Sequence, residues 1–124
     1  MPHPKDAPAA IVLAEATSQG DGTTNYDFNL EGWSGFSIQI EDTAGGAGNN
    51  TYTVSMSNTD AVIGSAVFVA ATANAFGVAS WTTSAFACPV AWPFIARYAR
   101  VTVVRAADGG GTDGEWNLTV RPVG

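Results

Sequence analysis

Side chains suited to nucleophilic or acid–base catalysis are few and poorly spaced in this chain. Its one histidine, His3, lies in a proline-rich N-terminal segment, where a general base is hard to hold in place. The segment EGWSGF partly matches the GxSxG pattern of a nucleophile elbow, but that pattern needs glycine where the chain has Phe36. We therefore expect Ser34 to be an outward-facing strand residue and the protein not to be an enzyme.

Carboxylates offer two further kinds of site. Asp27 with Glu31, and Glu41 with Asp42, would have to face each other across a cleft to act as glycosidases do, and a chain of 124 residues offers little room for one. Solvated strand ends are the favoured interpretation. The segment ADGGGTDGEW combines oxygen ligands with glycine turns, which suits calcium, although it lacks the EF-hand spacing. A plain loop is favoured there and no cofactor is expected; the candidate calcium ligands are Asp108, Asp113 and Glu115.

A long uncharged run occupies the 36 residues from Ala61 to Ala96. An ordinary soluble domain has a charged residue about every fourth position. Pro89, Pro93 and many small polar residues argue against a membrane-spanning helix, and no Lys/Arg cluster flanks the run. Successive side chains of a strand point to opposite faces of its sheet. If the run were buried only in the core of its own chain, its outward-facing half would normally include charged residues. We therefore expect the run to be buried against other subunits.

Aromatic side chains gather in this uncharged run, and two uses are open. Exposed aromatics can serve as stacking platforms for sugars, but sugar sites usually add amides or carboxylates, and only Asn74 is at hand. Interface cores are enriched in aromatics and depleted of charge, which favours subunit contacts. The residues predicted to form these contacts are Phe68, Phe76, Trp81, Phe86, Trp92 and Phe94.

The charges are unevenly placed along the chain. The formal net charge is −6; residues 1–60 hold eight acids with Lys5 as the one basic residue, and residues 97–124 hold four arginines. An acidic chain without a basic stripe is a poor nucleic-acid binder, so nucleic acid is not expected as a partner. By period two, Arg97 and Arg105 share one strand face and Arg100 the other. We expect all three to form inter-strand or inter-subunit ion pairs with the acids of residues 15–42.

Alternation of apolar and polar residues between glycine- and asparagine-rich turns predicts an all-β fold. Residues 61–70 carry apolar side chains on both faces, as a doubly covered strand does. Residues 71–80 allow a short helix, and the proline-punctuated 81–96 suits a loop or edge. The other strands are predicted at 10–16, 23–30, 33–42, 50–60, 95–106 and 115–123.

These strands predict an antiparallel β-sandwich or jelly roll of about 7–8 strands. The last two strands are expected to form a hairpin through the glycine-rich residues 107–114. One domain covers residues 10–124, and residues 1–9 form an extended N-terminal arm. Cys88 is the only cysteine and the N-terminus lacks the layout of a secretory signal, which fits assembly in a reducing cytoplasm.

Two resemblances follow from these segments. FIARYARVTV resembles the ARYVR-type strand of discoidin-like jelly rolls, as does its pairing with EWNLTVRPV, over residues 95–123. Those domains usually have a terminal disulfide that the single Cys88 does not supply, so their ligand function is not carried over. In size, layout and composition, the whole chain resembles bacteriophage capsid decoration (cement) proteins.

Decoration proteins are small, β-rich and often trimeric, and they use a terminal arm to reach over neighbouring capsid subunits. The resemblance implies a non-enzymatic protein on the capsid surface of the virion, made in the host cytoplasm. Its partners would be the major capsid protein and copies of itself in a homotrimer, without nucleic acid or membrane. Two alternatives are a carbohydrate- or receptor-binding module of a tail tip or fibre, and a tail-tube or connector subunit. The arm residues implied to contact the capsid are Pro2, His3, Pro4 and Lys5.

Overall fold

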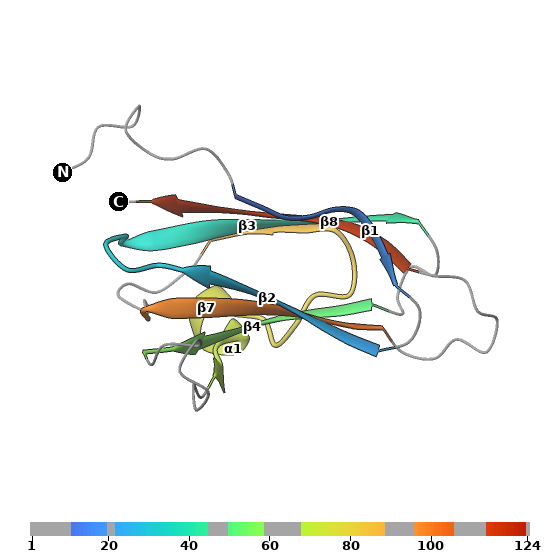
Figure 1. Cartoon of the computed structure of the whole chain (residues 1–124). Coiled ribbons are helices and arrows are strands. Elements are labelled where there is room, and N and C mark those ends of the chain that lie inside the picture. Colours follow the sequence, from blue (N-terminus) through green and yellow to red (C-terminus); the bar gives the residue numbers. More distant parts are fainter. Residues whose placement is uncertain are drawn as a thin grey trace.

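The computed structural model describes residues 11–19, 22–44, 50–58, 68–88, 96–105 and 114–123. They form eight strands and one short helix (Figure 1). In chain order these are β1 (Ile11–Gln19), β2 (Gly22–Asn29), β3 (Gly35–Ala44), β4 (Asn50–Ser57), β5 (Val69–Ala70), α1 (Thr72–Phe76), β6 (Ala85–Ala87), β7 (Tyr98–Arg105) and β8 (Gly114–Val123).

Two antiparallel four-stranded sheets face each other and make a β-sandwich (Figure 1). The strand orders are β1-β8-β3-β6 and β2-β7-β4-β5. The first strand pairs with the eighth, the second with the seventh, the third with the sixth and the fourth with the fifth. A chain that is doubled back on itself and then wrapped into two sheets in this order is a jelly roll. The predicted antiparallel β-sandwich or jelly roll is therefore confirmed, and residues 1–9, predicted to form an arm, lie outside the described residues.

The predicted hairpin between the last two long strands is wrong. β7 lies between β2 and β4, whereas β8 lies between β1 and β3 in the other sheet. In the described part of the chain, β4 and β5 are the one consecutive pair of strands that is hydrogen-bonded. A glycine-rich link suits a crossing between sheets as well as a tight turn, so its composition did not distinguish the two.

The core lies between the two sheets and is built by alternation along most of the length of the long strands. On β3, Phe36, Ile38 and Ile40 are buried while Gln39 and Glu41 are exposed. Across the sandwich, β4 and β7 contribute their own inward rows. Each fully buried aliphatic side chain contributes roughly 1.5–3 kcal/mol. The inward residues from the other strands include Tyr52, Val54, Ala99, Val101, Val103, Trp116, Leu118 and Val120.

The uncharged run folds in short pieces where the structure describes it. β5 is two residues long and both are exposed, with Val69 at 64%, so the prediction of a doubly covered strand is wrong for these residues. The short helix allowed over 71–80 is present as α1. It ends at Gly77, whose left-handed backbone (φ 79°) lets its N–H bond the Ala73 carbonyl at 3.0 Å. β6 is an edge strand, as the prolines predicted.

Residues 71–81 close the outer edge of β4. The Val54 N–H donates to Thr72 Oγ1 at 2.7 Å, and the Val54 carbonyl accepts from the same hydroxyl at 3.0 Å and from the Ala71 N–H at 2.9 Å. Tyr52 exchanges two backbone hydrogen bonds with Trp81, at 2.8 and 3.0 Å. An open strand edge is a template for unwanted pairing, and here the chain covers this one itself.

Candidate functional site

The aromatic residues predicted as subunit contacts take different positions. Phe76 is 7% exposed and belongs to the core of its own chain. Its ring meets that of Phe36 edge-on at 5.6 Å between centroids, and that of Trp81 at 5.1 Å. Trp81 is partly buried against the same core. These two aromatics therefore serve the monomer's own packing, which leaves Phe76 almost no surface for a neighbouring subunit. Trp92 and Phe94 lie outside the described residues.

Phe68, the residue just before β5, lies against Arg100 on β7. The guanidinium carbon of Arg100 is 4.0 Å from the centroid of the Phe68 ring, a cation–π contact. Arg100 also donates two hydrogen bonds to Asp27 on β2, at 2.6 and 2.9 Å. This hydrogen bonding raises the pKa of the Arg100 guanidinium. Arg100 thus joins two strands of one sheet within a single chain.

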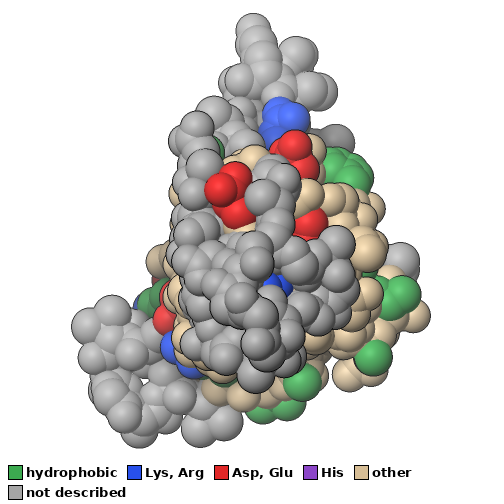
Figure 2. Space-filling view, turned by 90° about the vertical axis from the view of Figure 1, so that its right-hand side faces the viewer, with side chains coloured by type: hydrophobic (Ala, Val, Ile, Leu, Met, Phe, Trp, Pro, Cys, Tyr) green, Lys and Arg blue, Asp and Glu red, His purple; other side chains and the backbone are tan. Residues whose placement is uncertain are grey.

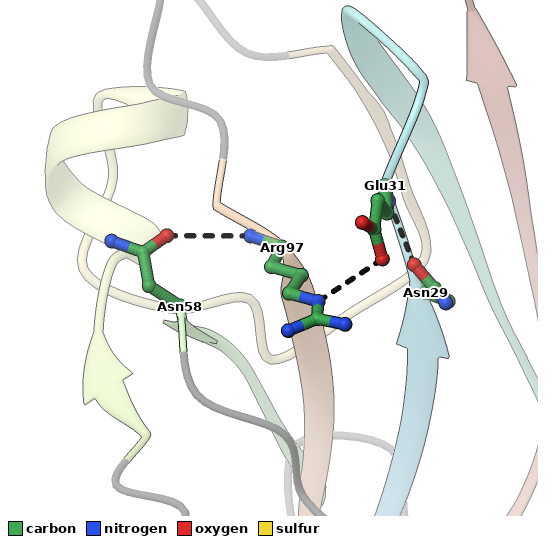
Figure 3. Close-up of polar contacts among 4 residues, drawn as sticks. All are labelled: Asn29, Glu31, Asn58 and Arg97. Carbon is green, nitrogen blue, oxygen red and sulfur yellow. Dashed lines mark hydrogen bonds and ion pairs between the residues drawn. The ribbon is translucent and has the colours of Figure 1, made fainter.

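Arg97 makes the second such ion pair, at the end of the sandwich where β2 ends and β7 begins (Figure 3). Its Nε donates to Glu31 at 3.0 Å, and both side chains are largely exposed. The Glu31 N–H donates to the Asn29 side chain at 2.7 Å, and the Arg97 N–H donates to the Asn58 side chain at 3.4 Å. Asp27 and Glu31 are thus each paired with an arginine that lies on β7 or just before it.

Arg105 faces inward and is 2% exposed. Its partner across the sheet is Asn50, whose amide donates to Asp42 at 3.4 Å and to the Tyr52 hydroxyl at 3.2 Å. The Tyr52 hydroxyl donates to Asp42. Burial, and then the hydrogen bond to Asp42, raise the pKa of Tyr52, so this phenol keeps its proton to a higher pH than an ordinary tyrosine does. The cluster is a network of polar groups that joins both sheets at one end of the sandwich.

That end faces the viewer in Figure 2. Acidic side chains gather on its upper part, and the visible hydrophobic side chains form separate patches rather than one continuous area. Of the calcium candidates, Glu115 lies at the start of β8, and Asp108 and Asp113 lie outside the described residues. Among the residues that the structure describes, no three carboxylate, histidine or cysteine side chains gather as metal ligands do.

One group of outward side chains lies together on the outer face of the β1-β8-β3-β6 sheet. A shallow depression of about 170 Å³ is lined there by Ser37, Gln39, Phe86, Thr119 and Arg121. Gln39 is opposite Phe86 on one side and opposite Thr119 on the other, and Ser37 is opposite Arg121. Directly opposed residues have Cβ atoms about 4.5–5.5 Å apart. Phe86 is 70% exposed, so its ring presents most of its surface to solvent.

Four of these five residues were not among the predicted site residues. Phe86 was predicted as a subunit contact, and only Asn74 was considered as an amide close to the aromatics. Gln39 is far from Phe86 in the sequence, and the strand register alone brings the two together. The sequence did show that polar residues alternate with Phe36, Ile38 and Ile40, which predicts a polar outer face for this strand. It did not show which strands would pair with it.

No described helix is long and apolar enough to span a bilayer. No protein family model, curated protein or solved structure matches this chain. Function must therefore be argued from the surfaces that the jelly roll presents.

Proposed function

We propose that this chain is a non-enzymatic structural subunit of a bacteriophage particle, which decorates the outer surface of the head and links neighbouring capsid subunits. The observation that carries the proposal is the position of β1. This strand begins at Ile11, shortly after residues 1–9, and it is the last strand of its sheet in the described part of the chain. It exposes Ile11 and Val12, the latter at 57%. An uncovered apolar strand edge suits pairing with another chain.

In this proposal residues 1–9 act as the arm. Pro2, His3, Pro4 and Lys5 contact the major capsid protein, and the edge of β1 continues the contact onto a neighbouring subunit. Three copies joined as a trimer would attach at several points at once, so modest individual contacts would hold tightly. The protein would act mechanically, by opposing the outward pressure of packaged DNA. Trp92 and Phe94 remain proposed as contacts between the copies.

The test compares binding to heads that lack the protein. Full-length protein is mixed with such heads and sedimented, beside a variant without residues 1–9 and a Val12→Lys variant. We expect the full-length protein to cosediment and both variants to lose most of their binding. Val104→Lys is the matched control, because Val104 is also an exposed strand valine but lies on β7 in the other sheet. Full-length protein that stays monomeric by analytical ultracentrifugation and leaves the heads unoccupied would refute the proposal.

The two tail hypotheses give different outcomes in the same experiment. A tail-tube or connector subunit would assemble alone into rings or tubes, which electron microscopy would detect. A tail-tip or fibre module would leave heads unoccupied and bind to the host cell surface. Either result would replace the head proposal.

A further inference from the structure

The depression on the outer face of the β1-β8-β3-β6 sheet has the composition of a small-ligand site. Its five lining residues come from three strands: Ser37 and Gln39 from β3, Thr119 and Arg121 from β8, and Phe86 from β6. One aromatic ring beside four polar side chains is a more polar lining than drug-sized pockets usually have, which suits a ligand rich in hydroxyl groups. At about 170 Å³ it is smaller than the roughly 300–1,000 Å³ of typical drug-sized pockets, so it suits one ring-sized group.

The polar groups of the depression match the hydroxyl groups of a sugar. Gln39 offers two N–H donors and a carbonyl acceptor, and the Ser37 and Thr119 hydroxyls can each donate and accept. A sugar hydroxyl likewise donates and accepts, so each of these groups can pair with one. The exposed ring of Phe86 supplies a flat apolar surface against which the C–H face of a sugar ring can stack.

Arg121 adds a preference for negative charge. It is the one charged side chain of the five, it is exposed, and it lies opposite Ser37 in the sheet. On the same face of β3, Glu41 lies about 13 Å beyond Ser37 and about 7 Å beyond Gln39, so Arg121 is the charge at the Ser37 end of the depression and Glu41 lies past its Gln39 end. The planar guanidinium pairs with a carboxylate through two parallel hydrogen bonds.

We propose that this depression binds an acidic saccharide unit, with Phe86 against the sugar ring, Gln39, Ser37 and Thr119 on its hydroxyls, and Arg121 on its carboxylate. The site lies beside the strand proposed for attachment, because Val12 on β1 is directly opposite Thr119 in the sheet. The two proposals use different groups, since attachment uses the edge of β1 and the glycan would lie on the outer face over β3, β6 and β8. The inference also stands if the head proposal fails.

Galacturonate is the probe, because it differs from galactose by the carboxylate. Binding is followed by the backbone amide signals of Gln39, Thr119 and Arg121 in two-dimensional NMR of the full chain. We expect a dissociation constant in the millimolar range, as is typical of one small ring on a shallow surface. Galactose should bind about fivefold more weakly, in line with the loss of one exposed ion pair. Acetate, which has no ring, should leave these signals unchanged.

Variants separate the two parts of the site. Phe86→Ala should weaken galacturonate binding about tenfold, and Arg121→Gln should make galacturonate and galactose bind equally. Val104→Ala, on the other sheet, should change neither affinity. The proposal is wrong if galactose binds as well as galacturonate to the unaltered protein, if acetate shifts the same signals, or if Arg121→Gln keeps the preference. Shifts that map to residues outside the depression would equally overturn it.

Discussion

Two strand edges of the sandwich are treated in opposite ways. The outer edge of β4 is covered by residues 69–81, through backbone bonds to Val54 and Tyr52 and through the ring of Trp81. The outer edge of β1 has no such cover in the described residues, and Ile11 and Val12 are exposed beside it. Proteins usually cover or blunt their edges, because bare ones recruit other chains. The contrast separates an edge that the chain covers itself from an edge that is bare among the described residues.

This contrast also changes the interpretation of the uncharged run. Its absence of charge predicted burial against other subunits. Residues 69–81 instead form backbone hydrogen bonds with the outer edge of β4 in their own chain. These contacts use main-chain groups and the Thr72 hydroxyl, so part of the uncharged run serves the packing of its own chain. The four predictions below test whether the closed edge serves folding and the open edge serves attachment.

The largest effect is expected for Trp81→Ala. The substitution removes the ring that packs on Phe76 and on the core, and truncation of a partly buried aromatic should lower the free energy of unfolding by about 2–3 kcal/mol. Urea unfolding measures it. Phe86→Ala is the matched control, since that ring is 70% exposed and its loss should cost less than about 0.5 kcal/mol. Equal losses for the two variants would contradict a special role of Trp81 in closing the β4 edge.

Thr72→Val should lower the free energy of unfolding by about 1–2 kcal/mol. The change keeps the volume but removes the hydroxyl that bonds the N–H and carbonyl of Val54, so a buried N–H loses its partner. Thr72→Ser keeps the hydroxyl and should restore most of the stability. A valine variant as stable as the original chain would show that the edge of β4 does not depend on this contact.

Raising the pH above about 10 should lower the free energy of unfolding through the titration of Tyr52. Burial raises its folded pKa above the ordinary value of 10, so the native state holds this proton more tightly than the unfolded chain. The stabilisation is fully present below about pH 10 and is lost as pH rises above it, by up to about 1.4 kcal/mol per pH unit. Urea unfolding between pH 9 and 11 measures the slope. Tyr52→Phe lacks the titrating group, so an unchanged slope in that variant would exclude this cause.

The smallest effect on folding is expected at the open edge. Val12→Lys should change the free energy of unfolding by less than about 0.5 kcal/mol, because this side chain already faces solvent. Its loss of binding to heads, described above, would then be separable from any loss of stability. A variant that unfolds well below the original chain in urea would show that β1 contributes to the monomer rather than to attachment.

The sequence predicted the sandwich because most strands alternate cleanly, and alternation follows directly from a sheet with one buried face. It failed at the connection between β7 and β8, because glycine-rich links occur both in hairpins and in crossings between sheets. The depression around Phe86 was missed for a related reason. Gln39, Phe86 and Arg121 are brought together by register, and register between distant strands is set by tertiary packing.

The pairing of first strand with last has a consequence for the order of folding. β4 and β5 are neighbours in sequence and close a short loop, whereas Ile11 meets Val120 only after nearly the whole chain has been brought round. Loop closure costs more entropy as the loop lengthens, so β1 should dock late and be the first strand to separate. A strand that docks last can leave its own sheet and pair with another chain while the other strands keep their contacts. The same topology that slows the folding of the monomer would leave its N-terminal strand ready to join a neighbour.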